Sequence, residues 1–218
     1  MNSIEYRRKI YEQLQSKYAG KGLYPQTSKL RYTFELSTNG SHYSKQIALE
    51  TAIKHATERF LRNQDSFTAH SIRFGVIIEN TTKPGHAHII SFPQQTATET
   101  QAGVFTNTDA EVLWNGYLQI KSGSELTLEA LPLSLFRKEN QRNTLSAEIN
   151  STDGLVELSE KINLVGQKDQ TLILDFPTLA TTNIAVTADY KVYAVIEFIG
   201  FLVNGGSSTE VKGTAFNS

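Results

Sequence analysis

Apolar and polar residues alternate along residues 30–37, which is the pattern of a β-strand with one buried face. The apolar positions of this segment are Leu30, Tyr32, Phe34 and Leu36. Asn39 and Gly40 follow directly, and both residue types tolerate a positive φ. We therefore predict a tight turn at Asn39-Gly40 that returns the chain along residues 41–47 as a second strand.

Two other segments repeat their apolar residues with the helical period. The first, residues 4–18, has Arg and Lys on much of its polar face, and GKGLYP at 20–25 ends it because Gly and Pro disfavour helix. Its apolar positions are Ile10, Tyr11, Leu14 and Tyr18. The second segment, at about 47–61, is rich in helix-forming Ala and Glu. Its apolar positions are Leu49, Ala52, Ile53, Ala56 and Phe60.

Beyond Asn63 the chain turns to Val, Ile, Thr, Phe and Tyr, interrupted by turn sequences such as KPG and SGS. We predict strands at about 66–79, 86–93, 112–121, 125–136, 144–150, 155–165, 170–176, 187–203 and 208–214. Strands and helices do not alternate, so the pattern predicts an all-β fold. We expect a single antiparallel jelly-roll barrel or sandwich with an N-terminal amphipathic helix and one further helix at about 47–61.

The segment 112–136 predicts a hairpin that turns at SGS, residues 122–124. Alternation assigns Leu118, Ile120, Leu126, Leu128 and Ala130 to the core side. It assigns Tyr117, Gln119 and Lys121 to the outside. Trp114, the only tryptophan, lies where the alternation begins, so we predict a core position for it.

Both faces of the predicted strand at 187–203 are largely apolar, since only Lys191 and Glu197 on its second face are charged. Such a strand should be covered on both sides. A neighbouring subunit is one natural cover.

A length of 218 residues suffices for one substantial core with appendages. We divide the chain into a basic N-terminal helical arm, 1–27, and a jelly-roll domain, 28–218, with the helical insertion at 47–61. The net charge of -1 excludes a strongly basic body that coats nucleic acid. Residues 1–31, however, carry seven Lys or Arg and two Glu, which gives +5 and leaves -6 on the remainder. The candidate contacts to a partner or membrane in the arm are Arg7, Arg8, Lys9, Lys17 and Lys21.

No residue pattern predicts catalysis, a cofactor or a metal. Cysteine is absent, which excludes disulfides and thiolate metal sites. His86 and His88 would point to the same face of a strand, as a metal pair could, but no third ligand is indicated and surface or packing roles are favoured. Two carboxylate pairs could be read as glycosidase acids but are favoured as solvated charges: Asp109 with Glu111, and Glu157 with Glu160. We therefore do not expect an enzyme.

The hairpin segment also resembles a known family. An aromatic residue with Asn-Gly is followed by L-x-I-K-x-G and then by L-P-x-x-x-F; the matching residues are Trp114, Asn115, Gly116, Leu118, Ile120, Lys121, Gly123, Leu131, Pro132 and Phe136. Further anchors agree in order: LRNQDSF at 61–67, KPGHAHIISFP at 83–93 and FIGFLVNGG at 198–206. In these scattered anchors the chain is similar to virion proteins of small tailless, membrane-containing, single-stranded-DNA-type phages and prophages of Bacteroidetes-like bacteria. It departs from them at 47–61 and in its basic arm.

The resemblance implies a jelly-roll capsid protein that packs with copies of itself and other coat subunits into an icosahedral shell, as a major coat or vertex component. The basic arm would reach the internal viral membrane, with nucleic acid as a weaker candidate and no small-molecule substrate. The location would be the virion, after synthesis in the cytoplasm of a host bacterium. The alternative is a carbohydrate-binding or adhesin module in which Trp114 and nearby tyrosines stack on sugar rings.

Overall fold

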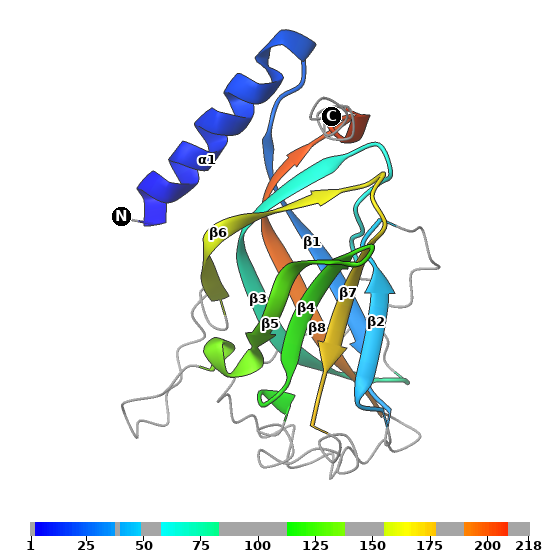
Figure 1. Ribbon diagram of the computed structural model, residues 1–218. Helices are drawn as coiled ribbons and strands as arrows, with labels where there is room; N and C mark the ends of the chain where they lie inside the picture. Colours follow the sequence, from blue (N-terminus) through cyan, green and yellow to red (C-terminus); the bar gives the residue numbers. More distant parts are fainter. Residues whose placement is uncertain are drawn as a thin grey trace.

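The computed structural model describes residues 3–37, 40–48, 58–82, 113–137, 155–177 and 190–208 (Figure 1). The chain begins with helix α1 (Ser3–Tyr18), which continues into the 3-10 turn η1 (Ala19–Lys21). The described strands are β1 (Gln26–Glu35), β2 (His42–Gln46), β3 (Ser66–Asn80), β4 (Tyr117–Ser122), β5 (Glu125–Pro132), β6 (Leu155–Val165), β7 (Gln170–Asp175) and β8 (Tyr190–Val203). A second 3-10 turn, η2 (Leu133–Phe136), follows β5.

The strands form two antiparallel sheets that pack face to face as a sandwich (Figure 1). Sheet A has the order β1-β8-β3-β6 and sheet B has the order β2-β7-β4-β5. The pairings are nested, since β4 pairs with β5, β3 with β6, β2 with β7 and β1 with β8. The chain thus runs as one long hairpin folded over on itself. The predicted all-β antiparallel class is confirmed.

The core lies between the inner faces of the two sheets, where apolar side chains alternate along each strand. Central members are Leu118 and Ile120 of β4, Leu172 and Leu174 of β7, and Val192, Ala194, Ile196 and Phe198 of β8. Trp114 is 1% exposed, and its ring meets the Phe74 ring edge to face at 5.1 Å. The predicted core position of Trp114 is therefore confirmed.

Strand β8 is buried on both faces, as its sequence predicted. It lies inside sheet A, between β1 and β3. On its outer face, Tyr193 and Val195 cluster with Ile77 of β3. Further along, Phe201 and Val203 pack with buried residues of α1. At this end of β8 the cover comes from the chain's own helix.

The prediction that residues 41–47 return along the preceding strand is wrong. β1 pairs with β8 in sheet A, whereas β2 pairs with β7 in sheet B. Gly40 N donates to Ser37 O at 3.1 Å, and the Tyr43 hydroxyl donates to Gly40 O at 3.1 Å, so the chain bends as it crosses between the sheets. Alternation specifies which face of a strand is buried, but it does not specify the partner strand.

The described ends of the predicted helix at 47–61 are not helical, and residues 49–57 lie outside the described residues. Ile47 N donates to Gln170 O at 2.9 Å. Arg59 exchanges two backbone hydrogen bonds of 2.9 Å with Arg31 of β1. A residue whose amide and carbonyl both bond to a strand cannot complete a helical turn, so the predicted end of the helix is corrected.

The predicted hairpin forms from β4 and β5, with Leu118 and Ile120 buried as expected. Leu126 and Ala130 are exposed, which corrects their predicted core positions. β5 is an edge strand of sheet B, and its register against β4 shifts on both sides of Ile120. Each shift breaks the simple alternation on which the prediction depended.

Four predicted strands agree with the structure in their described residues, since β3, β6, β7 and β8 lie where strands were expected at 66–79, 155–165, 170–176 and 187–203. The strands predicted at 112–121 and 125–136 are shorter than expected, because residues 113–116 are not in a strand and residues 133–136 form η2. The strands predicted at 86–93 and 144–150 lie outside the described residues, as does all of 208–214 except Ser208. The described residue Ser208 is not in a strand.

Candidate functional site

The basic N-terminal segment is a helix docked on the outer face of sheet A. Ile10, Leu14 and Tyr18, spaced four residues apart, are buried against Phe201 and Val203 of β8. The Tyr18 hydroxyl also lies 3.1 Å from Ser66 Oγ at the start of β3. This apolar stripe packs on the chain's own sandwich. In the described residues, no helix is both long and apolar enough to cross a membrane.

A bulge in β6 supplies the polar side of the docking surface. Ala69 pairs with Ile162 and Ser71 pairs with Glu157, so residues 158–161 of β6 lie opposite His70 alone. Around this bulge, the Tyr6 hydroxyl reaches Ser159 O at 3.5 Å and Lys161 Nζ donates to Gln13 Oε1 at 2.9 Å. Both of these contacts to α1 therefore come from bulged residues of β6.

An ion pair at this joint connects Arg7 of α1 to Glu157 of β6. Arg7 Nη2 lies 2.6 Å from Glu157 Oε1, and the Ser3 hydroxyl donates to the same oxygen. These hydrogen bonds hold the pKa of Glu157 below its ordinary value, Ser3 first and then Arg7. A carboxyl kept ionised in this way is unsuited to the general-acid role considered for Glu157 with Glu160.

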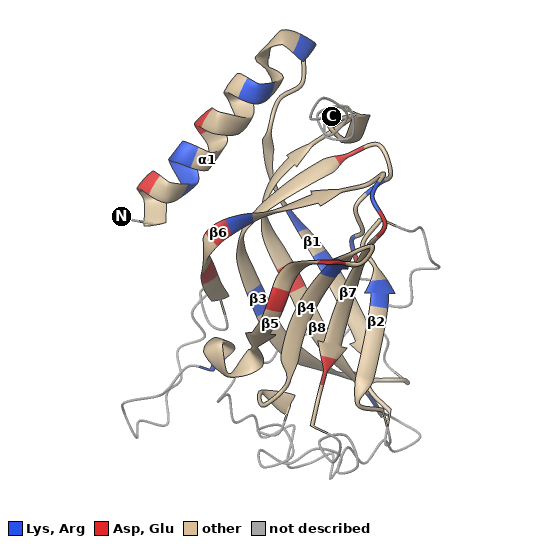
Figure 2. Ribbon diagram, viewed as in Figure 1, with Lys and Arg blue, Asp and Glu red and all other residues tan. Residues whose placement is uncertain are grey.

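The other predicted basic contacts, on α1 and η1, are exposed to solvent. Figure 2 shows where Lys and Arg lie along these two elements. Arg8 pairs with Glu12 at 2.8 Å, one turn further along the helix. Lys17 Nζ lies 5.7 Å from the centre of the Tyr18 ring. Lys9 and Lys21 are exposed, and no ion pair joins either to another described residue. The structure therefore separates Arg7, which serves docking, from the four outward cations.

His70 lies in the layer between α1 and sheet A. It is 4% exposed, its Nδ1 is 2.7 Å from Ser71 Oγ, and its ring centre is 5.6 Å from that of Phe201. Phe201 in turn meets Tyr11 of α1 at 5.5 Å. Burial lowers the pKa of His70, the Arg7 charge lowers it further, and Glu157 partly opposes both effects.

Two buried carboxylates are held by cations elsewhere in the sandwich. Glu197, on the outer face of β8, lies 2.5 Å from Arg31 Nη2, with Lys29 and Arg73 at 3.5 and 3.6 Å. Glu58 is bonded by Lys45 and by the hydroxyl and amide of Thr33. Glu197 thus links β8 to β1 and β3, and Glu58 links Lys45 of sheet B to Thr33 of sheet A by charge-assisted hydrogen bonds.

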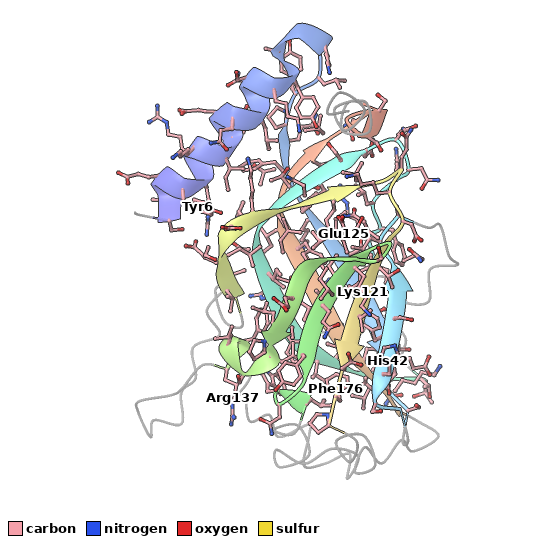
Figure 3. All side chains as sticks on the ribbon, in the orientation of Figure 1. Tyr6, His42, Lys121, Glu125, Arg137 and Phe176 are labelled. Carbon is pink, nitrogen blue, oxygen red and sulfur yellow. The ribbon has the colours of Figure 1, made fainter. Side chains whose placement is uncertain are left out.

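The outer face of sheet B carries no described helix and is largely open to solvent. His42, Asp175 and Tyr117 are cross-strand neighbours on β2, β7 and β4. His42 Nδ1 lies 2.5 Å from Asp175 Oδ1, and Tyr117 is 48% exposed. Figure 3 shows His42, Lys121 and Glu125 on the strands of this sheet. The face thus combines an aromatic ring with polar and charged side chains.

Large apolar side chains are exposed beside this face. Leu126 of β5 is 49% exposed and Leu135 of η2 is 53% exposed. Among the described strands, β5 is also an edge of sheet B, although Glu125, Glu129, the register shifts and Pro132 make this edge a poor template for another strand. We call the outer face of sheet B together with β5 and η2 the open face.

The described residues contain no group of three or more His, Cys, Asp or Glu side chains that could hold a metal ion. His86 and His88 lie outside the described residues, as do Asp109 and Glu111. The predictions for these four residues stay predictions.

Described residues on which the sequence resemblance was based have packing roles in this chain. Leu133 N donates to Gly116 O at 2.9 Å, which ties η2 to the start of β4. A Cβ at Gly116 would collide with Asp175 O. The anchors at 61–67 and 198–206 meet in space, where Gly205 N donates to Asp65 Oδ1 at 2.9 Å. KPGHAHIISFP at 83–93 lies outside the described residues.

No protein-family model matches the chain. No curated protein matches it either.

Proposed function

We propose that this chain is a jelly-roll subunit of a viral capsid. The nested pairing of strands supports the jelly roll, since folding one long hairpin over itself produces two four-stranded sheets with this order. The jelly roll is an architecture of viral coats and of lectins, so the fold alone does not decide between these roles.

The observation that carries the capsid proposal is the asymmetry of the two outer faces. Sheet A carries α1 over its Phe201 end, whereas the open face exposes Tyr117, Leu126 and Leu135. Tyrosine is enriched in the cores of protein interfaces, and polar side chains typically surround them. We propose that the open face contacts copies of this chain and other coat subunits.

The basic surface of α1 and η1 would face the inside of the shell. It consists of Arg8, Lys9, Lys17 and Lys21. Exposed cations attract anionic headgroups and phosphates over about 10 Å at moderate ionic strength. The internal viral membrane is the proposed partner, and nucleic acid is the weaker one. While α1 is docked, its residues Ile10 and Leu14 are buried against the sandwich. Contact between the docked helix and the membrane is therefore electrostatic.

Light scattering after size-exclusion chromatography, with electron microscopy of the eluted species, tests the proposal. We expect multiples of the 24.3 kDa chain that grow with protein concentration, and closed rings or shells in the images. A mass of one chain at every concentration up to the millimolar range, together with absence of the protein from purified virions, would overturn it.

The carbohydrate-binding alternative loses one of its expected stacking residues, because Trp114 is in the core. Tyr117, exposed beside the His42–Asp175 pair, is the aromatic side chain that could replace it. Binding to a glycan array that is lost in Tyr117→Ala would favour this alternative, and no binding would leave the capsid proposal unopposed.

A further inference from the structure

We propose that α1 is an acid-released arm, in which protonation of His70 frees the helix from the outer face of sheet A. This inference concerns the joint between α1 and the sandwich, and it does not depend on the proposed function. It rests on a buried imidazole between two separable parts of the chain.

The geometry places His70 beneath the helix. Its side chain is almost fully buried and lies within hydrogen-bond distance of Ser71, and its ring is tilted by 56° against that of Phe201. Phe201 itself packs on Tyr11 and on the buried stripe of α1. The bulge in β6 faces His70 from the other side. A charged imidazole would have to remain in this layer without water, whereas release of α1 would let water reach it.

Burial and the charge of Arg7 oppose protonation of His70, whereas Glu157 favours it. α1 presents Arg7 and the neutral hydroxyl of Tyr6, and β8 presents the apolar ring of Phe201. β6 presents Glu157, with Glu160 and Lys161 further along the bulge. Burial and Arg7 outweigh Glu157, so the pKa of His70 in the docked state lies below its ordinary 6.5.

The sign of the effect follows from this lowered pKa. The docked state prefers neutral His70, so the released state binds a proton more readily as pH falls below 6.5. Glu157 contributes stability that is present above its ordinary pKa of 4.5 and is lost only as pH falls through its lowered pKa. Between pH 7.5 and 5.5 we therefore expect docking of α1 to depend on the protonation of His70.

The helix can separate without opening the main core. Ile10, Leu14 and Tyr18 belong to a satellite cluster with Phe201 and Val203, distinct from the core between the sheets. η1 and Gly22, which adopts a positive φ of 65°, join α1 to β1. Release would expose the apolar stripe of α1 next to its basic residues.

Hydrogen exchange of the full-length chain, resolved to α1 by mass spectrometry, tests the proposal. A released helix of this length is marginal in water, so the exchange of its amides reports undocking. After correction for intrinsic exchange, we expect protection of α1 to fall by up to about tenfold per pH unit below 6.5, until the docked pKa is reached. Protection of β3 and β8 should stay constant over the same range.

His70→Gln should remove this dependence of α1 protection on pH, because glutamine stays neutral. His42→Gln is the matched control, since His42 is exposed on the other sheet, and it should keep the wild-type slope. A wild-type slope that is absent, or one that survives in His70→Gln, would overturn the proposal. If His70→Gln itself undocks α1 at pH 7.5, the pH dependence of α1 protection in the wild type between pH 7.5 and 5.5 still tests the proposal.

Discussion

Lys45 and Glu58 form an ion pair whose burial makes each charge depend on the other. The Glu58 side chain is inaccessible, and Lys45 Nζ also lies 5.3 and 5.7 Å from the ring centres of Phe60 and Phe34. Removal of one charge from such a pair costs far more than removal of both, since the remaining charge has been taken out of water.

We therefore expect Lys45→Met to lower the free energy of unfolding by about 3–5 kcal/mol, measured by urea denaturation. The double variant Lys45→Met/Glu58→Gln should recover most of this loss, because it removes both charges and keeps a side-chain oxygen that can accept from the amide and hydroxyl of Thr33. Arg8→Ala is the control, since its pair with Glu12 is exposed and should contribute less than ~0.5 kcal/mol. Equal losses in the single and double variants would show that the ion pair is not the cause.

Gly200 lies in β8 where β3 approaches most closely. An added Cβ would collide with the carbonyl oxygen of Thr68, which is backbone and cannot turn away. We expect Gly200→Ala to cost about 1–3 kcal/mol or more in thermal or urea unfolding. Gly20→Ala, where nothing lies within 4 Å, should stay within about 1 kcal/mol of the wild type. A wild-type stability for Gly200→Ala would contradict the packing described for β8.

At the scale of elements, α1 is stabilised by packing more than by its own sequence. Leu14 is at the centre of the buried stripe, so Leu14→Ala should weaken docking by about 2–5 kcal/mol. The expected result is fast hydrogen exchange throughout α1, with unchanged tryptophan emission because Trp114 lies in the separate main core. Gln15→Ala, on the exposed side of the same turn, should leave exchange as it is. Loss of the Trp114 signal in Leu14→Ala would mean that the two clusters unfold together.

Element positions were predictable wherever the local pattern was long and regular. The stripe of α1 and the alternation of β8 could be read directly, because burial of one face imposes its period on the residues. The buried face of β5 could not be predicted in this way, because its register shifts place Leu126 on the outside. The end of the predicted helix near residue 61 failed because Arg59 bonds to β1, a tertiary contact that overrides helix propensity.

At the scale of the whole molecule, the sequence did not reveal which strands pair. β1 and β8 are separated by most of the chain, and nothing in the alternation of Leu30 to Leu36 names Ile196 or Phe198 as partners. The same holds for the candidate site. The basic residues of α1 were recognisable from their charges, but the docking of Arg7 on Glu157 required the bulge in β6 that only the fold creates.

The most direct test of the proposed assembly compares two exposed tyrosines by sedimentation equilibrium. Tyr117 lies on the open face, whereas Tyr24, which is 67% exposed, follows η1 away from it. A buried glutamate at an interface costs several kcal/mol, so Tyr117→Glu should raise the dissociation constant between subunits by at least about tenfold. Tyr24→Glu should leave that constant near the wild-type value. Association that is equally strong in both variants and the wild type would contradict assembly through the open face.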